Sequence, residues 1–202
     1  MHTRPTLASL IPLALTAAGG FVTTAHAQDA APDGSRDGVA TLQGYAAFKM
    51  GDYQKALEIW QPLAEKGSTA AQLSLGAMYE QGQGVTQDYA EAAKWYERAA
   101  AAGHGSAQFN LALLYETGRG VPRDLEKAAY WFRKAAEQGD RDSAYNLGVI
   151  YATGFGRGVT SDPKEAAEAL KWLGRAATKG HPQAANMAMV VERAHPGVAA
   201  AP

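Results

Sequence analysis

Two consecutive stretches decide the fold: "STAAQLSLGAMYEQGQGVTQDYAEAAKWYERAAAAG" (residues 68–103) and "HGSAQFNLALLYETGRGVPRDLEKAAYWFRKAAEQG" (residues 104–139). They align without a gap at a period of 36 residues (68 to 104), and a fixed period of this size is the signature of a repeat architecture. The identical positions include Tyr79/Tyr115, Gly82/Gly118, Asp88/Asp124 and Trp95/Trp131. A third copy, residues 140–180, carries five extra residues before Trp172.

Each repeat is predicted to fold as two helices. In residues 104–139, apolar side chains recur at helical spacing both before and after a pair of glycines. Asp124 stands where the second helix needs an N-cap, and Gly139 stands where that helix needs to stop. Asp88 and Asp162 hold the same capping position in the other repeats. Because a pair of helices has no core of its own, each repeat must stack on a neighbour.

The glycine pair Gly118–Gly120 has two readings, a phosphate-binding loop at a helix N-terminus or a turn. The pair recurs at the same place in every repeat, as Gly82 with Gly84 and as Gly154 with Gly156. A catalytic phosphate loop is needed only once, and the Gly-Lys-Ser/Thr of a P-loop and the third glycine of a dinucleotide fingerprint are both missing. The glycines are therefore predicted to be turns that bind no ligand.

The framework reads Leu-Gly-x-x-Tyr-x-x-Gly-x-Gly-Val-x-x-Asp, then Ala-Ala-x-Trp-[Tyr/Phe]-x-[Arg/Lys]-Ala-Ala and a closing Gly. Two copies depart from it: Ala112 replaces the first glycine in the second copy, and the loop of the third copy is stretched. This pattern resembles the Sel1-like repeat, a relative of the tetratricopeptide repeat. Residues 68–180 carry three copies, whereas residues 44–67 are similar to a tetratricopeptide unit with a tight turn at residues 50–53. The resemblance implies an all-α fold, a right-handed α-solenoid of stacked antiparallel helix pairs.

The expected organisation follows from these repeats. Residues 28–36 and 194–202, which are rich in Ala, Gly, Pro and Asp, are expected to be a flexible segment and a disordered tail. The solenoid is expected over residues 37–193, with units 37–67, 68–103, 104–139 and 140–180 and a closing helix at 181–193.

The first 27 residues have the features of a cleavable signal peptide. A short positive stretch is followed by the apolar residues 7–22, and Ala25-His26-Ala27 forms an A-x-A cleavage site ahead of Gln28. The apolar stretch is interrupted by Pro12 and two glycines, so no membrane span is predicted there or elsewhere. The protein is expected to be periplasmic or secreted; the alternative is an N-terminus that is not cleaved.

Composition excludes several classes of function. The net charge is −1 and the basic residues do not cluster, which gives no footprint for nucleic acid. The absence of cysteine excludes disulfides, thiolate metal sites and a cysteine nucleophile. The scattered His104, His181 and His195 lack metal-ligand spacing, and no catalytic serine motif is present. No catalytic residue, metal or cofactor is therefore predicted.

Two periodic sets of residues have alternative readings. Asp88, Asp124 and Asp162 form either a row of carboxylates or a set of helix caps, and capping is favoured because Asp is a preferred N-cap. The equivalent tryptophans form either a ladder that stacks sugars or a packing element between helices. Packing is favoured because aromatic side chains dominate cores. The tryptophans are Trp95, Trp131 and Trp172.

The residues predicted to contact a partner lie on the first helices, at positions that vary between repeats. If the tetratricopeptide geometry applies, three equivalent sets face the groove: Leu73, Phe109 and Tyr145; Ala77, Leu113 and Val149; Glu80 and Glu116. The alternative is that these side chains pack between adjacent first helices, because an apolar groove must be exposed to bind anything.

The resemblance implies that the protein is an adaptor, not an enzyme, which holds a protein or peptide on the concave face. Glutamates at the rim would favour a basic or amide-rich peptide. The alternative function is that of an accessory protein that binds or helps to process cell-envelope glycan, with sugars stacked on exposed aromatic residues.

Overall fold

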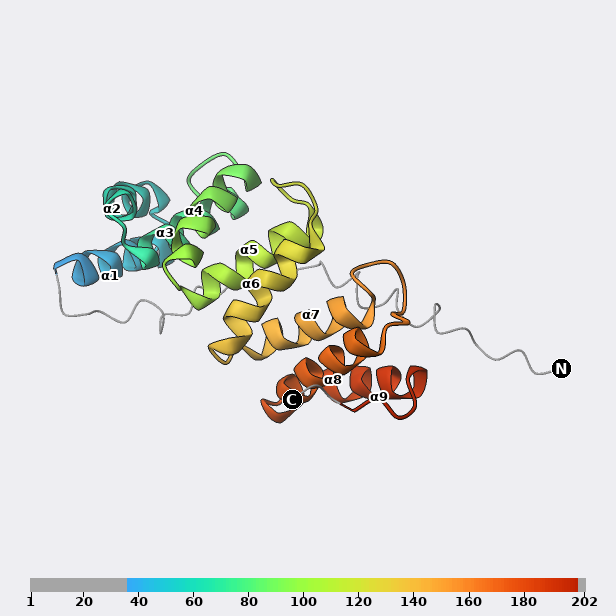
Figure 1. Ribbon diagram of the computed structural model, residues 1–202. Helices are drawn as coiled ribbons and strands as arrows, with labels where there is room; N and C mark the ends of the chain where they lie inside the picture. The colour runs from blue at the N-terminus through green and yellow to red at the C-terminus, as the bar shows by residue number, and fades with distance from the viewer. Residues whose placement is uncertain (1–35, 200–202) are drawn as a thin grey trace. The chain divides into compact units, whose positions relative to one another are not determined.

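The computed structural model describes residues 36–199, and within that range the chain forms nine α-helices and no β-strand (Figure 1). This confirms the predicted all-α class. The described residues fall into two compact units, residues 36–138 and residues 139–199. The predicted signal peptide, most of the segment 28–36 and residues 200–202 lie outside the described residues.

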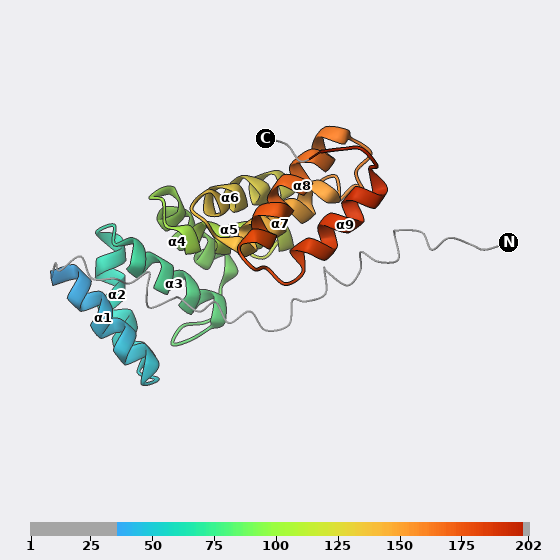
Figure 2. The ribbon, with the colours of Figure 1, turned by 90° about the horizontal axis from the view of Figure 1, so that it is seen from below.

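The unit 36–138 contains three helix pairs. Its helices are α1 (Arg36–Lys49), α2 (Tyr53–Glu65), α3 (Thr69–Gln81), α4 (Tyr89–Ala101), α5 (Gly105–Thr117) and α6 (Leu125–Glu137). The two helices of each pair pack on one another, and successive pairs are joined where α2 packs on α3 and α4 packs on α5 (Figure 2). Each repeat therefore stacks on its neighbour in this unit, as the sequence requires.

The predicted aspartate caps are all present. The Asp88 carboxylate accepts hydrogen bonds from the main-chain N–H groups of Ala90 and Glu91 at 2.9 and 3.0 Å. The Asp124 carboxylate caps α6 in the same way, and the Asp162 carboxylate accepts from the N–H of Lys164 at 2.8 Å. These carboxylates satisfy helix-terminal donors, so the capping interpretation is confirmed.

The glycine pairs are turns. Helices α3 and α5 end at Gly82 and Gly118, whose φ values of 69° and 72° lie in the left-handed region that favours glycine. The second glycine of a pair also allows close packing, because a Cβ atom on Gly120 would overlap the main chain of Tyr89 and Ala90. These conformations account for both glycines without a ligand.

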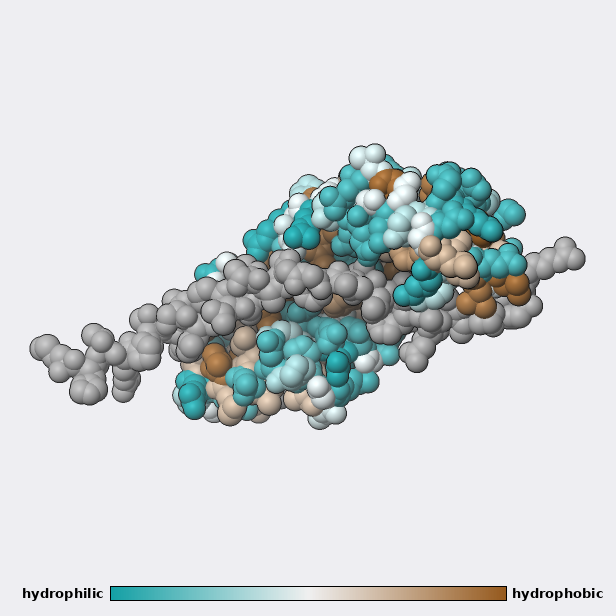
Figure 3. Space-filling model, turned by 180° about the vertical axis from the view of Figure 1, so that it is seen from behind, coloured by the Kyte–Doolittle hydropathy of each residue, from teal (hydrophilic) through white to brown (hydrophobic). Residues whose placement is uncertain are grey.

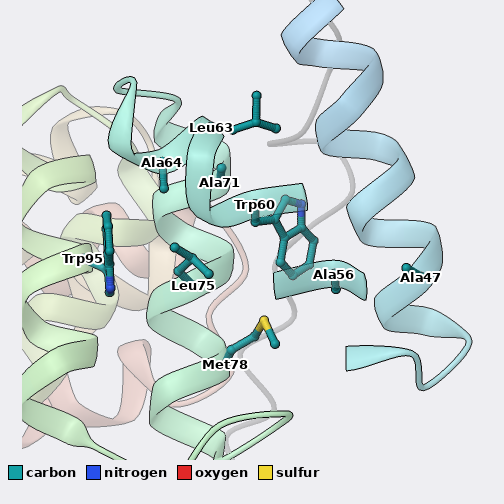
Figure 4. Close-up of a cluster of buried hydrophobic side chains, with 9 residues drawn as sticks. All are labelled: Ala47, Ala56, Trp60, Leu63, Ala64, Ala71, Leu75, Met78 and Trp95. Atoms are coloured by element: carbon teal, nitrogen blue, oxygen red, sulfur yellow. The ribbon is translucent and has the colours of Figure 1, made fainter. Parts of the chain in front are cut away.

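The core of the first repeats forms around an aromatic ring from each second helix. In Figure 4 the Trp60 ring of α2 lies between Ala47 of α1 and Met78 of α3, and its Nε1 donates to the Thr41 carbonyl at 3.1 Å. The remaining buried members of this cluster are Ala56, Leu63, Ala64, Ala71, Leu75 and Trp95. A Cβ atom on Gly44 would overlap this ring, so glycine in the first helix makes room for the aromatic side chain of the second.

A second core cluster joins α3, α4 and α5. Its buried members are Leu73, Ala92, Ala93, Tyr96, Ala99, Ala100, Ala107, Leu111 and Leu114. Gly76 of α3 approaches the Tyr96 ring so closely that a Cβ atom would overlap it. The small residues of α4 thus allow close approach of neighbouring helices, while Tyr96 fills the space between them.

The unit 139–199 contains α7 (Arg141–Ala152), α8 (Pro163–Thr178) and α9 (Ala184–Ala194). The helices α7 and α8 pack closely in the same way, because Gly148 of α7 leaves room for the Leu173 side chain of α8. Helix α9 packs on both of them. The five extra residues of this repeat lengthen the helix as well as the loop, since α8 has 16 residues where α6 has 13. No helix in the range 36–199 has the length and apolar character needed to cross a membrane.

Candidate functional site

The predicted groove residues are divided between the two units. Leu73 and Glu80 lie on α3, Phe109, Leu113 and Glu116 lie on α5, and Tyr145 and Val149 lie on α7. Leu73 is only 3% exposed and belongs to the core cluster around Tyr96, and Ala77 is buried as well. These two side chains therefore pack inside the unit, as the alternative interpretation holds, and do not line an exposed groove.

Helix α5 differs from α3 because its equivalent side chains reach the surface. Phe109, Leu113 and Glu116 are each half-buried. Their spacing of four and three residues places them on one face of the helix, which we call the α5 face. The Phe109 ring meets the Phe132 ring of α6 edge to face, with the ring centroids 5.8 Å apart. Phe109 is therefore supported by a buried aromatic ring while part of its own surface stays accessible.

Glu80 takes part in the internal structure of the unit. Its carboxylate accepts a hydrogen bond of 2.7 Å from the Tyr96 hydroxyl, and the side chain of the buried Asn110 faces the same hydroxyl. Burial raises the pKa of Glu80, although the Tyr96 hydroxyl and the positive charge of Arg119 act in the opposite direction. Burial and the neighbouring Glu80 raise the pKa of Tyr96 well above its usual value. Glu80 thus ties α3 to α4.

Glu116 occupies the equivalent position in the next repeat but has a different environment. The position of Tyr96 is occupied by Phe132, which has no hydroxyl to donate. Burial raises the pKa of Glu116, and the charge of Arg123 only partly offsets this effect. Among residues 36–199 no side chain donates a hydrogen bond to the Glu116 carboxylate. Within this range Glu116 thus lacks the counterpart of the hydrogen bond between Tyr96 and Glu80.

In the unit 139–199, Tyr145 is 9% exposed and stacks on His181, with the ring centroids 4.0 Å apart and the planes inclined by 14°. His181 Nδ1 accepts from the main-chain N–H of Gln183, and Nε2 lies 3.8 Å from an Asp142 carboxylate oxygen. Burial lowers the pKa of His181. Tyr145 thus supports the segment that leads into α9. Of the two groove residues predicted on α7, only Val149 is half-buried.

The tryptophans pack between helices. Trp95 and Trp172 are 8% and 2% exposed, and Trp131 packs against the second core cluster. Sequence reasoning missed an exposed aromatic residue beside them: Tyr130 is 53% exposed and meets the Trp131 ring at 4.9 Å. The available signal was the repeat alignment, since the equivalent positions hold lysine, a residue typical of a solvent-facing position.

The face seen in Figure 3 is mainly hydrophilic, with small and separate hydrophobic areas. The large apolar side chains that are exposed in the described part of the chain are Val39, Leu42, Met50, Tyr130, Val159 and Met189. Within residues 36–199 no three His, Asp or Glu side chains gather in an arrangement that would hold a metal ion.

The stacked helix pairs define the class of an α-solenoid repeat protein. The Sel1 repeat family model matches residues 38–68, 69–104, 105–140 and 141–181, which is more than half of the chain. The chain therefore belongs to the Sel1 repeat family. The first unit was predicted to be of the tetratricopeptide type, and this is corrected to a fourth Sel1 repeat. Its tight turn replaces the Gly-x-Gly-Val loop, which conceals the helix framework that it shares with the others.

Two solved structures resemble this chain. A Sel1 repeat protein from Oxalobacter formigenes is 32% identical, with a TM-score of 0.68 and coverage of 80% of this chain and 63% of its own. A protective antigen of uropathogenic Escherichia coli with an SLR fold is 30% identical, with a TM-score of 0.72 and coverage of 81% and 35%. This chain thus spans less than two thirds of either protein.

A curated relative matches a shorter stretch. An exopolysaccharide production negative regulator of Rhizobium leguminosarum bv. viciae is 44% identical over 45 residues, which are 22% of this chain and 17% of that protein. Sel1 repeat proteins generally act as protein-interaction scaffolds, and their fold is typically not enzymatic.

Proposed function

We propose that this protein is an exported scaffold that binds a protein or peptide through the first helices of its repeats. The single observation that supports this most strongly is the α5 face, where Phe109 and Leu113 offer apolar surface next to the Glu116 carboxylate. Export is supported by the A-x-A site and the apolar stretch ahead of Gln28.

Binding at the α5 face would rest on a few anchors. Partly exposed aromatic and aliphatic side chains on a supported surface commonly supply most of the free energy of an interface. The edge-to-face contact with Phe132 holds the Phe109 ring in place, so little side-chain entropy is lost when a partner docks. In the unit 139–199, Val149 is proposed as the corresponding surface of α7, since Tyr145 is buried against His181.

An affinity pull-down from the native envelope, with the full mature chain as bait and mass spectrometry as readout, should identify the partner. The double variant Phe109→Ala/Leu113→Ala should then bind that partner with an affinity lower by ~2 kcal/mol or more, as expected for hot-spot residues. Tyr130→Ala, which changes an exposed aromatic residue on α6, serves as the matched control.

Circular dichroism separates binding from folding in this experiment. If the double variant keeps its helicity and binds the partner undiminished, the α5 face is not the docking surface. If it melts far below the wild type, Phe109 and Leu113 act mainly in packing, and the site assignment fails.

The second candidate function, binding of envelope glycan, is favoured by one observation. Tyr130 is exposed beside Trp131, with Lys134 Nζ 5.8 Å from its ring centre, an arrangement on which a sugar ring can stack. The buried Trp95 and Trp172 do not contribute to such a surface. Tryptophan emission that shifts with added glycan in the wild type but not in Tyr130→Ala would favour this alternative.

A further inference from the structure

Two glutamates at equivalent positions in successive repeats have different partners. Glu80 receives the hydroxyl of Tyr96 at 2.7 Å. Glu116 follows 36 residues later, but the residue that follows Tyr96 at the same interval is Phe132. The internal donor that satisfies the first carboxylate is therefore absent for the second.

No other side chain among the described residues replaces that donor. The charge of Arg123 acts on this carboxyl, but the Arg123 Nε donates to the main-chain carbonyl of Glu116, at 3.0 Å, and not to the carboxylate. The charge of Arg119 acts on Glu80. The residue 36 positions after Arg119, which would correspond to it for Glu116, is the uncharged Phe155. The Glu116 side chain is half-buried, so its carboxylate loses part of its hydration without gaining a donor from residues 36–199, and a ligand that brings a donor supplies the missing hydrogen bond.

The balance of charge at Glu116 favours an added cation. Burial is the largest influence on the pKa of this carboxyl and raises it, while the positive charge of Arg123 is a smaller, opposing influence. The carboxylate is therefore stabilised less by Arg123 than it is destabilised by loss of water. A second positive group that approaches the carboxylate closely would restore the balance.

The apolar neighbours define the shape of the ligand. Leu113 and Phe109 precede Glu116 by three and seven residues on the same helix face, and seven residues span ~10 Å along the axis. This arrangement presents apolar surface that ends at a carboxylate. A lysine side chain has the matching form, since a flexible stem of four methylene groups ends in an ammonium group with three donors.

We propose that Glu116, with Leu113 and Phe109, forms a specificity site for a lysine side chain presented by the protein partner. The inference rests on the proposed function, because it assigns the chemistry of the partner at the α5 face. It also separates the two glutamates: Glu116 recognises the partner, whereas Glu80 belongs to the core.

The test compares two probes that differ in a single charged group, N-acetyl-lysine methylamide and N-acetyl-norleucine methylamide. Each is titrated into the full mature chain labelled with nitrogen-15, and the amide signals of residues 105–117 are followed by NMR. The wild type should bind the lysine probe about five-fold more tightly than the norleucine probe, as expected for one partly exposed ion pair.

Four variants locate the effect. Glu116→Gln should abolish the preference for lysine, whereas Glu80→Gln, the matched control at the equivalent position, should leave it unchanged. Arg123→Gln should strengthen the preference, because Gln87 shows that glutamine at this position still donates to the preceding carbonyl. Ala112→Gly/Phe132→Tyr, which also restores the glycine that makes room for the Tyr96 ring in the preceding repeat, should weaken it by supplying the internal hydroxyl that Glu80 already has.

Equal binding of the two probes, or an equal loss in Glu80→Gln and Glu116→Gln, would overturn the inference. If both probes bind equally and Phe109→Ala removes both, the apolar docking surface stands and only the role of Glu116 fails. The proposed function fails if the partner identified by pull-down binds the Phe109→Ala/Leu113→Ala variant as tightly as it binds the wild type.

Discussion

Replacing Tyr96 by Phe removes a single oxygen atom from the core of the unit 36–138. The Tyr96 side chain is fully buried, and its hydroxyl donates to the Glu80 carboxylate at 2.7 Å. A hydrogen bond to a charged group contributes about 1.5–3 kcal/mol. Tyr96→Phe should therefore lower the free energy of unfolding by this amount, which corresponds to a fall in Tm of roughly 3–12 °C for a domain of this size.

The loss should depend on pH. Burial raises the pKa of Glu80 above that of an exposed carboxyl, and the Tyr96 hydroxyl acts against this rise. A carboxyl whose pKa is higher in the folded than in the unfolded state reduces stability as the pH rises through that folded pKa. Without the hydroxyl the pKa of Glu80 rises further, so the difference between variant and wild type should be largest at neutral pH and shrink in acid.

Urea unfolding followed by circular dichroism, at neutral pH and at about pH 5, measures both effects. Tyr130→Phe is the control, because it removes a hydroxyl from an exposed tyrosine. In a Glu80→Gln background, Tyr96→Phe should cost less, since the charge has been removed. A loss below about 0.5 kcal/mol, or a loss equal at both pH values, would refute the claim that this pair ties α3 to α4.

The other predictions concern turns, caps, a histidine and processing. Gly118→Ala should lower stability by ~1 kcal/mol or more in urea titrations because φ is 72°, while added phosphate or nucleotide should leave the Tm of the wild type unchanged. Asp124→Ala should cost ~1 kcal/mol and Asp124→Asn much less, since asparagine still caps α6. Burial lowers the pKa of His181, so folding should lose stability in acid as the pH falls from about 6.5 through that lowered pKa. His181→Phe, which keeps a ring against Tyr145, should reduce this loss in thermal melts at graded pH. Intact-mass measurement on protein from the native host should find a chain that begins at Gln28, and full-length chain in the cytosol would contradict export.

Structural features that depend only on residues close together in the chain, such as helix caps, could be predicted from the sequence. The position of Asp124 as an N-cap and of Gly118 as a left-handed C-cap follows from which residue types satisfy helix ends. The repeat alignment also placed the tryptophans in the packing between helices. It misclassified the first unit because the tight turn at residues 50–53 lacks the glycine signature by which the other units were recognised.

The candidate site was only partly predictable. The alignment treats Leu73 and Phe109 as equivalent, yet Leu73 is buried in the cluster of α3, α4 and α5 and Phe109 keeps an accessible surface. Exposure depends on which side chains neighbouring helices bring against a residue, and a repeat alignment contains no such information. Tyr130 was not predicted for a related reason: the other repeats have lysine at this position, so Tyr130 does not belong to the recurring pattern of aromatic residues.

The sequence by itself determined the repeat period, the helix pairs, their caps and the family, because each depends on residues close together in the chain. Only the tertiary structure distinguished Glu80 from Glu116. Both are glutamates at the same repeat position, but one accepts the hydroxyl of Tyr96, which lies 16 residues away on the next helix, and the other has no such donor. Burial and hydrogen bonding are properties of neighbours in space, and these properties decide which of the two carboxylates has an internal hydrogen-bond partner.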